Sequence, residues 1–107
     1  MVFVELPIFV RCANELFSDE DIAKLQGTLL ENPDAGDLIP GGSGLRKLRV
    51  PLPGRGKRGG VRVIYYHWVG NAQCYLVYAY AKNTASDLSK DQLQRLADVI
   101  AAEVTHG

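Results

Sequence analysis

Hydrophobic residues recur at helical spacing in three segments of the chain, which are residues 8–16, 18–32 and 89–104. The second and third segments also carry the marks of a helix start. A serine at the first position (Ser18 or Ser89) can cap the helix, and a polar residue three positions later (Asp21 or Gln92) can bond back to the backbone of that serine. The pattern therefore predicts three helices, two of them with a capping box.

Four other segments are typical of β-strands: residues 1–6, 45–50, 61–68 and 74–81. In the second of them polar and apolar residues alternate, so that Lys47 and Arg49 share one face. The last two are almost continuously apolar and aromatic, which indicates a sheet covered by helices. Residues 33–44 and 51–60 are rich in glycine and proline and are predicted to be loops, the second of them a basic hairpin loop.

The order of these elements is that of an α+β protein. One strand precedes two helices, three strands follow, and a helix ends the chain. We expect a small antiparallel sheet with helices packed on one face. A chain of 107 residues without internal repeats or a long linker is expected to form a single domain, residues 1–107.

Composition excludes several classes of protein. A content of 47% hydrophobic and 22% charged residues is ordinary for a soluble protein. No apolar run approaches the roughly 20 residues that span a bilayer, and the N-terminus has neither a basic leader nor a small-residue cleavage site. We therefore expect a cytoplasmic protein without membrane contact. Cys12 and Cys74 match no metal-ligand spacing and no disulfide framework, so neither a metal nor a cofactor is expected.

The charges are distributed unevenly along the chain. Positive and negative residues balance over the whole chain, with 12 Lys+Arg and 12 Asp+Glu. No Asp or Glu lies between Asp37 and Asp87, however, and the basic residues concentrate at 44–66. A surface built only for solubility would mix the two signs. Like charges gathered in one part of a chain favour an anionic ligand, so the sequence predicts a surface that binds nucleic acid.

The strand phases place aromatic side chains among these cations. If the faces of the three strands coincide, one face of the sheet presents Lys47, Arg49, Arg62, Ile64, Tyr66, Tyr78, Tyr80 and Lys82. Cations hold phosphates, and aromatic rings stack on unpaired bases. Taken singly, each of these residues has an alternative structural role, either as a solvated cation or as a tyrosine packed in the core.

Several short motifs carry a resemblance to a known family. They are Gly-Leu-Arg-Lys-Leu-Arg at 44–49, a Gly/Lys/Arg loop, Gly-Gly-Val-Arg-Val-Ile-Tyr-Tyr at 59–66, and Tyr-Ala-Lys-Asn at 80–83 followed by Asp-Leu-Ser at 87–89. In this order they resemble the RelE/HigB toxins of bacterial type II toxin–antitoxin pairs, above all the HigB-type branch. The resemblance implies a microbial RNase-like fold and an mRNA interferase, an endoribonuclease that cuts mRNA in the ribosomal A site. It also implies metal-independent attack of a ribose 2′-hydroxyl on the adjacent phosphate.

The resemblance assigns roles within the basic block. Arg62 corresponds to the strand arginine that contacts the phosphate and the transition state, and Lys47 and Arg49 correspond to the cationic pair on the preceding strand. Lys82 corresponds to the basic position after the last strand, and the tyrosines are candidates for stacking or proton transfer. The expected catalytic residues are Arg49, Lys57, Arg62, Tyr66, Tyr80 and Lys82, and the expected RNA-binding residues are Arg46, Lys47, Arg55 and Arg58.

The residue types of the basic block suit this chemistry. The block lacks the paired carboxylates that would hold catalytic Mg²⁺, which argues against a two-metal mechanism. His67 has the opposite strand phase to Arg62, and His106 lies at the C-terminus, which argues against a two-histidine mechanism. What remains can orient a phosphate and neutralise its developing charge. The general base stays open among Lys57, Lys82 and a tyrosine, since each needs a strongly lowered pKa to accept a proton at pH 7.

Two features depart from the pattern of the family. Some relatives have an arginine where Asn83 stands and a tyrosine in the last helix, and this helix has no tyrosine. The alternative function is therefore a non-catalytic RNA-binding module or a degenerate toxin. The resemblance also implies a cognate antitoxin protein as a partner, beside mRNA and the ribosome. An antitoxin segment rich in acidic and apolar residues would complement residues 44–66.

Overall fold

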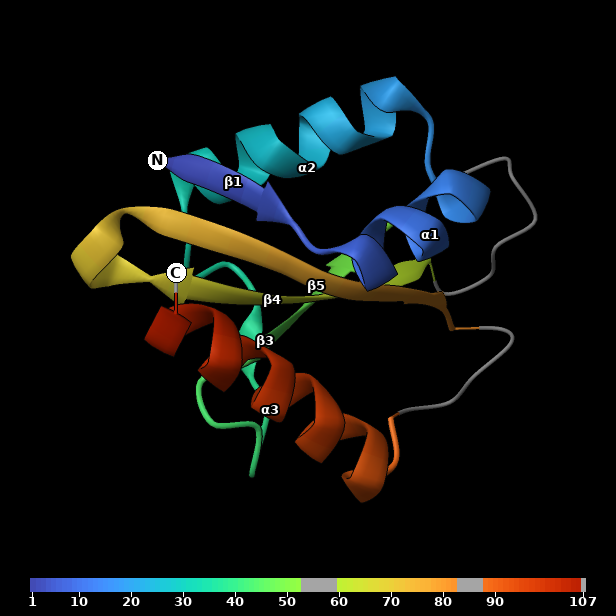
Figure 1. Ribbon diagram of the computed structural model, residues 1–107. Coiled ribbons are helices and arrows are strands. Elements are labelled where there is room, and N and C mark those ends of the chain that lie inside the picture. The colour runs from blue at the N-terminus through green and yellow to red at the C-terminus, as the bar shows by residue number, and fades with distance from the viewer. Residues whose placement is uncertain (53–59, 83–87, 107) are drawn as a thin grey trace.

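The computed structural model describes residues 1–52, 60–82 and 88–106 (Figure 1). Its elements are, in chain order, β1 (Val2–Glu5), α1 (Pro7–Leu16), α2 (Asp19–Glu31), β2 (Asp37–Leu38), β3 (Arg46–Val50), β4 (Val61–Trp68), a 3₁₀ turn (Val69–Asn71), β5 (Gln73–Ala81) and α3 (Lys90–His106). The predicted helices and strands are confirmed, with ends that differ by no more than two residues. Most of the predicted basic hairpin loop, residues 51–60, lies outside the described residues.

The strands form one sheet in the order β1-β5-β4-β3-β2. At its centre β4 and β5 pair antiparallel along their whole length, with a β-bulge between Ile64 and Tyr65. At one edge β1 runs parallel to β5. The α+β class is confirmed, and the expectation of a purely antiparallel sheet is corrected to a mixed one. The edge pairing joins segments about 70 residues apart in the chain, which no local pattern records.

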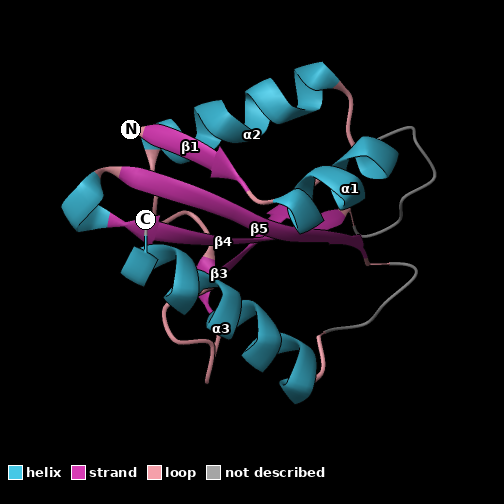
Figure 2. Ribbon diagram, in the orientation of Figure 1, coloured by secondary structure: helices cyan, strands magenta, loops and turns pink. Residues whose placement is uncertain are grey.

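Helices cover both faces of the sheet: α1 and α2 lie over one face and α3 over the opposite one (Figures 1 and 2). On the first side Val61, Val63 and Tyr65 of β4 join a core with the two N-terminal helices. On the second side Ile64 of β4 and Val77 of β5 join a core with α3. The expected single helical layer is therefore corrected to two. The central strands are apolar on both faces, and each face must be shielded from water.

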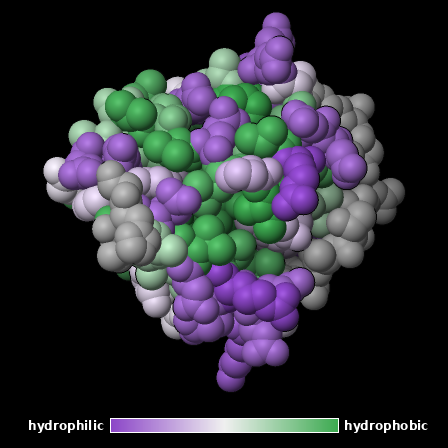
Figure 3. Space-filling view, viewed as in Figure 1, coloured by the Kyte–Doolittle hydropathy of each residue, from purple (hydrophilic) through white to green (hydrophobic). Residues whose placement is uncertain are grey.

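The surface of the molecule shows the same division. In the view of Figure 3, apolar residues gather across the middle of the molecule, between the two helical layers, and hydrophilic residues dominate the lower part, where α3 lies. Each helix therefore turns its apolar stripe toward the sheet and its polar side toward water.

The predicted helix caps are present at α2 and α3. The Ser18 backbone N–H donates to Asp21 Oδ2 at 2.8 Å, and the Asp21 N–H donates to Ser18 Oγ at 3.2 Å. In α3 the Ser89 N–H donates to Gln92 Oε1 at 2.9 Å, and the Gln92 N–H donates to Ser89 Oγ at 3.1 Å. Such a cap stabilises a helix by about 0.5–2 kcal/mol. The second cap also defines where α3 begins, beside the sheet.

A short strand, β2, lies within the segment predicted to be a loop. Asp37 pairs with Lys47 and Leu38 pairs with Arg46, both antiparallel. After it the chain turns back on itself, and the Ile39 N–H donates to the Leu45 carbonyl at 3.0 Å. Glycine content alone favoured a loop here, because a two-residue strand has no detectable alternation. The turn brings residues 39–40 over the α3 side of the sheet, where they line a cleft.

Candidate nucleic-acid interface

The register of the sheet brings predicted site residues into a row. Arg49 on β3 lies opposite Arg62 on β4, and Arg62 lies opposite Tyr80 on β5. Directly opposite residues of antiparallel strands point to the same side, with Cβ atoms about 4.5–5.5 Å apart. Two guanidinium groups and a phenol that are distant in the sequence therefore share one short row.

A second row runs beside the first. Lys47 lies opposite Ile64, which lies opposite Tyr78, and the rings of Tyr78 and Tyr80 lie 6.0 Å apart with a tilt of 32°. The prediction that the three strand phases coincide is confirmed for these two rows. We call them the cationic face, which consists of Lys47, Arg49, Arg62, Ile64, Tyr78 and Tyr80.

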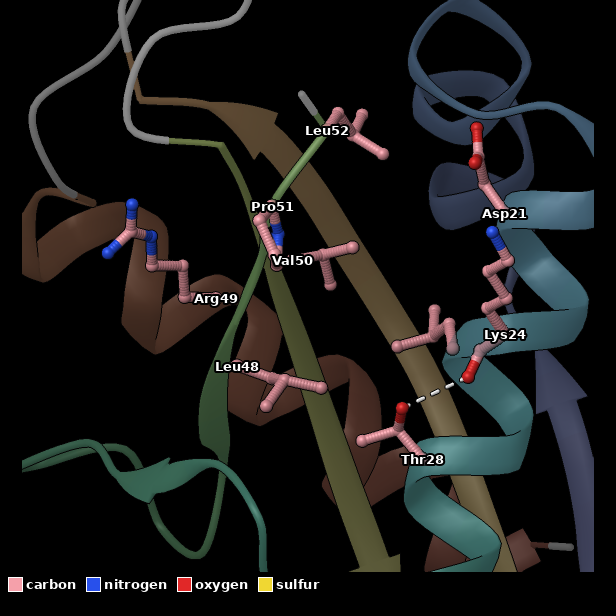
Figure 4. Close-up of a pocket in the computed structure, with 9 residues that line it drawn as sticks. Asp21, Lys24, Thr28, Leu48, Arg49, Val50, Pro51 and Leu52 are labelled. Carbon is pink, nitrogen blue, oxygen red and sulfur yellow. Dashed lines mark hydrogen bonds between the residues drawn. The ribbon is translucent and has the colours of Figure 1, made fainter. Parts of the chain in front are cut away.

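The cationic face lies on the α3 side of the sheet. Figure 4 views β3 beside α2 and shows the side chains of Leu48 and Val50 directed toward that helix, whereas Arg49 points away from it. Leu48 and Val50 accordingly belong to the core under α1 and α2. Alternation along the strand thus places Arg49 on the opposite side, with the residues of its row.

The residues of the rows differ in their exposure to solvent. Arg49 is exposed, Lys47 and Arg62 are half-buried, and Tyr80 retains only 6% of its accessible surface. A half-buried cation is screened less by water, so it interacts more strongly with a phosphate than a fully exposed one. Tyr80 packs in the core with α3. It therefore forms part of the floor of the cationic face and offers little of its ring for stacking.

A cleft of about 240 Å³ adjoins the rows. Its floor is formed by Ile64 and Tyr80, and Lys47 stands at its sheet side. One wall is Ile39 and Pro40, from the turn that follows β2, and the other wall is the start of α3. The residues from that start are Leu88, Ser89, Lys90 and Leu93. The cleft thus combines apolar walls with two lysines, Lys47 from β3 and Lys90 from α3.

Two further predicted residues lie at the ends of the strands. Lys82 follows β5 by one residue, and its backbone N–H donates to the Gly60 carbonyl at 3.2 Å, which holds it beside the start of β4. Tyr66 pairs with Tyr75 beyond the bulge and packs in the core with α3. Four residues of strand separate Tyr66 from Arg62, a distance of roughly 13 Å. The structure therefore does not place Tyr66 beside the arginine row.

Arg46 lies on the other side of the sheet from Lys47. Its Nη1 donates to the Gly36 carbonyl at 2.7 Å and its Nη2 lies 3.5 Å from Asp34 Oδ1, to which His67 Nδ1 is also close at 3.6 Å. These contacts hold the 33–36 segment against the sheet. Arg46 therefore has a structural role in this fold and is not part of the cationic face.

Three predicted residues, Arg55, Lys57 and Arg58, lie outside the described residues. Their roles in RNA binding and catalysis stay predictions. The described residues on either side of them, Leu52 and Gly60, are both buried.

Burial raises the pKa of the Tyr78 phenol, and the Cys12 thiol nearby adds to the effect. Burial also raises the pKa of the Cys74 thiol, to about 12. A raised pKa keeps both groups protonated at neutral pH. Tyr78 can therefore donate a hydrogen bond to an anion, and Cys74 is an inert core residue.

A larger cavity, of about 300 Å³, lies between α2 and β3 (Figure 4). It is lined mainly by apolar side chains such as Leu25 and Leu48, with Asp21 and Lys24 at its α2 side. Arg49 of the cationic face also contributes to its lining, and the other lining residues belong to α2 and to residues 48–52. Over residues 1–52, 60–82 and 88–106, no group of three or more His, Cys, Asp or Glu side chains is placed to hold a metal.

Sequence reasoning missed one cationic residue of the cleft, Lys90. It is the first residue of α3, is exposed, and lines the same cleft as Lys47. In the sequence it lies after the basic residues of 44–66, in a C-terminal segment where acidic residues outnumber basic ones. The capping box at Ser89 was the available signal, because it located the start of a helix directly before a lysine.

Fold and site together define a small α+β protein with a mixed sheet, helices on both faces and a cationic face beside α3. Residues 7–106 match the family model described as the RelE toxin of the RelE/RelB toxin–antitoxin system. The chain therefore belongs to the RelE toxin family, and the resemblance found in the sequence is confirmed at that level. The HigB-type branch stays a prediction.

A solved structure supports the same fold. The chain is similar to the Escherichia coli toxin RelE in the free state, in a variant with two arginines replaced by alanine. The TM-score is 0.58 and the sequence identity is 17%, and the match covers 79% of this chain and 86% of that chain. At this identity the likeness concerns the fold. The described part of the chain contains no helix long and apolar enough to cross a membrane.

Proposed function

We propose that this toxin is an endoribonuclease that inhibits translation by cutting mRNA in the ribosomal A site. The observation that supports the proposal most directly is the row of Arg49, Arg62 and Tyr80 on one face of the sheet. The row places two permanent positive charges within reach of one phosphate.

In the proposed reaction the ribose 2′-oxygen attacks the adjacent phosphorus. The O2′–P bond forms as the P–O5′ bond breaks, so that the products are a 2′,3′-cyclic phosphate and a 5′-hydroxyl. A base takes the proton of the 2′-hydroxyl, and an acid returns a proton to the leaving oxygen. Each step uses protein side chains alone, so the proposal requires no metal or cofactor.

Arg62 has the central role in this proposal. Its guanidinium group can hold two phosphate oxygens and neutralise the charge that builds on them in the transition state, with Arg49 beside it. Removing one preorganised donor of this kind typically lowers the rate by about 10²–10³-fold. Lys47, in the adjoining row, holds the neighbouring phosphate of the RNA.

Three residues are candidates for the proton-transfer steps. Lys82 stands at the end of β5 beside the start of β4, and Tyr80 lies opposite Arg62. Either can exchange a proton with a nucleotide bound on the row, and Lys57 is a third candidate.

We further propose that a cognate antitoxin restrains the toxin by covering the cationic face, and that the toxin acts in the cytoplasm, where ribosomes are. An antitoxin segment with acidic and apolar residues would complement Lys47 and Arg49 together with the apolar walls of the cleft. Co-expression with the product of an adjacent short reading frame should restore growth.

The test is to induce the protein in a bacterium and to map new mRNA 5′ ends, with Arg62→Ala as the active-site variant and Arg11→Ala as a matched control. Arg11 is an exposed arginine on α1 and lies outside the cationic face. We expect cuts within translated frames for the native protein and for Arg11→Ala. The cuts should disappear with Arg62→Ala and in a transcript whose translation is blocked.

A non-catalytic RNA-binding module is the second candidate, because the last helix lacks the tyrosine found in some relatives. It predicts RNA that co-purifies with the protein but no new mRNA ends. If Arg62→Ala retains full toxicity while its thermal unfolding matches the native protein, the catalytic proposal is wrong.

A further inference from the structure

The cleft beside the arginine row has the chemistry of a nucleotide site. Ile39 and Pro40 form one apolar wall, Leu88 and Leu93 form the other, and Ile64 lies in the floor between them. A volume of about 240 Å³ equals roughly eight waters at about 30 Å³ each. That space suits one planar ring with its sugar. Apolar walls on either side favour a flat ligand over a hydrated chain of charges.

Two cations, from different elements, contribute to the lining of this apolar cleft. Lys47 reaches it from β3, and Lys90 reaches it from the first residue of α3. Ligands that pair a flat ring with an anion fit this arrangement, and a nucleotide is such a ligand. Asp37, which lies opposite Lys47 in the β2–β3 register, is exposed and does not line the cleft.

The serine at the start of α3 already forms hydrogen bonds within the helix. Ser89 Oγ accepts from the Gln92 N–H, and Gln92 Oε1 accepts from the Ser89 N–H. The capping box therefore uses these polar groups within the helix. Lys90 is the charged side chain that the start of α3 contributes to the lining of the cleft.

The position of the cleft connects it to the proposed reaction. Lys47 is two residues from Arg49 on the same face of β3, and Tyr80, in the floor, lies directly opposite Arg62. Consecutive residues on one strand face are about 7 Å apart, close to the spacing of neighbouring phosphates in an extended RNA strand. A nucleotide in the cleft would thus be next to a phosphate held by the arginine row.

We infer that the cleft binds the nucleotide adjacent to the scissile phosphate, with Lys90 contacting its phosphate and the wall of Ile39 and Pro40 selecting its base. This inference rests on the proposed function and extends it to substrate selection. The turn after β2 then sets sequence preference, and the arginine row sets the rate of cleavage.

The test compares Lys90→Gln with Lys24→Gln, a control at an exposed lysine of α2 that lines the cavity on the other side of the sheet from the cleft. The probe is a single-stranded RNA oligonucleotide with a 2′-deoxy substitution at the cut position, so that binding is measured without cleavage. We expect Lys90→Gln to weaken binding about 3- to 10-fold and to reduce the slope of log K against log salt by about 0.7. Lys24→Gln should change neither quantity.

A second variant tests the wall. Ile39→Ala should change which nucleotide borders the mapped cuts, while cutting continues. Unchanged affinity and salt slope in Lys90→Gln, or no measurable binding of the probe by the native protein, would overturn the inference. Active cutting with those results would leave the nuclease proposal in place. Weakened binding in Lys90→Gln without any cutting by the native protein would support the subsite and refute the nuclease.

Discussion

The hydroxyl of Tyr65 provides the sharpest test of how this fold is held together. It donates to the Pro33 carbonyl at 2.7 Å and accepts from the Gly36 N–H at 2.9 Å, and the tyrosine is fully buried. Tyr65→Phe removes one oxygen and leaves both backbone groups without this partner. A buried group left unsatisfied costs about 1–3 kcal/mol. We expect the variant to lose about 2–3 kcal/mol of unfolding free energy.

The expected shift in melting temperature follows from the size of the protein. At about 2.1 cal/mol/K per residue, unfolding of 107 residues has an entropy of about 0.22 kcal/mol/K. A loss of 2–3 kcal/mol therefore lowers Tm by about 10 °C. Urea unfolding followed by the fluorescence of Trp68, the single tryptophan, gives the free energy directly. Both measurements are made in an Arg62→Ala background, so that the proposed toxicity does not limit expression.

Tyr75→Phe is the matched control. Its hydroxyl donates to Gln73 Oε1 at 3.0 Å, and that partner is a half-buried side chain that water can reach. We expect a loss of about 0.5–1 kcal/mol there. If Tyr65→Phe costs no more than Tyr75→Phe, the two bonds to the 33–36 segment do not stabilise the fold and the argument is wrong.

Tyr65→Phe should also change how the stability of the protein depends on pH. Burial raises the pKa of Tyr65 above its ordinary value of 10.0. Above about pH 10 the unfolded chain therefore loses this proton before the folded protein does, and stability falls as pH rises. Phenylalanine has no proton to lose. The difference in stability between the native protein and Tyr65→Phe should narrow above pH 10, and a difference that stays constant would contradict the buried phenol.

Three other predictions concern the residue before β4, helix α2 and the core. Gly60→Ala should cost at least about 3 kcal/mol, since φ is +75° there and an added Cβ would lie 2.6 Å from the Val50 carbonyl oxygen. Gly27→Ala, in an open position of α2, should stabilise by about 0.5–1 kcal/mol in the same urea assay. Iodoacetamide at pH 8 should label Cys12 far faster than Cys74, whose pKa of about 12 leaves about one thiolate in ten thousand; equal labelling rates would exclude a buried Cys74.

Local signals in the sequence were sufficient for the helices and the central strands. Ser18 and Ser89 were identified as caps from their position before an apolar stripe, and the structure has both capping boxes. The bounds of β4 agree residue for residue with the apolar run from Val61 to Trp68. These features depend on neighbours within four residues, so the sequence displays them directly.

Part of the site was also visible in the sequence. Alternation along each strand correctly grouped Lys47 with Arg49 and Tyr78 with Tyr80. The same alternation separates Arg46 from Lys47, and the structure accordingly holds Arg46 on the other side of the sheet, at Gly36 and Asp34. The prediction that Arg46 binds RNA rested on its charge and did not consider the face of the strand on which it lies.

Local patterns in the sequence indicated the helices, the central strands, the alternation of cations along them and the membership of the RelE toxin family. Contacts between distant segments fixed the rest: β1 runs parallel to β5, α3 covers the face opposite α1 and α2, and Lys90 and Lys47 line one cleft. The physical reason is the range of the interactions. Caps and alternation arise from bonds between near neighbours, whereas these arrangements come from burying apolar surface shared by segments far apart in the chain.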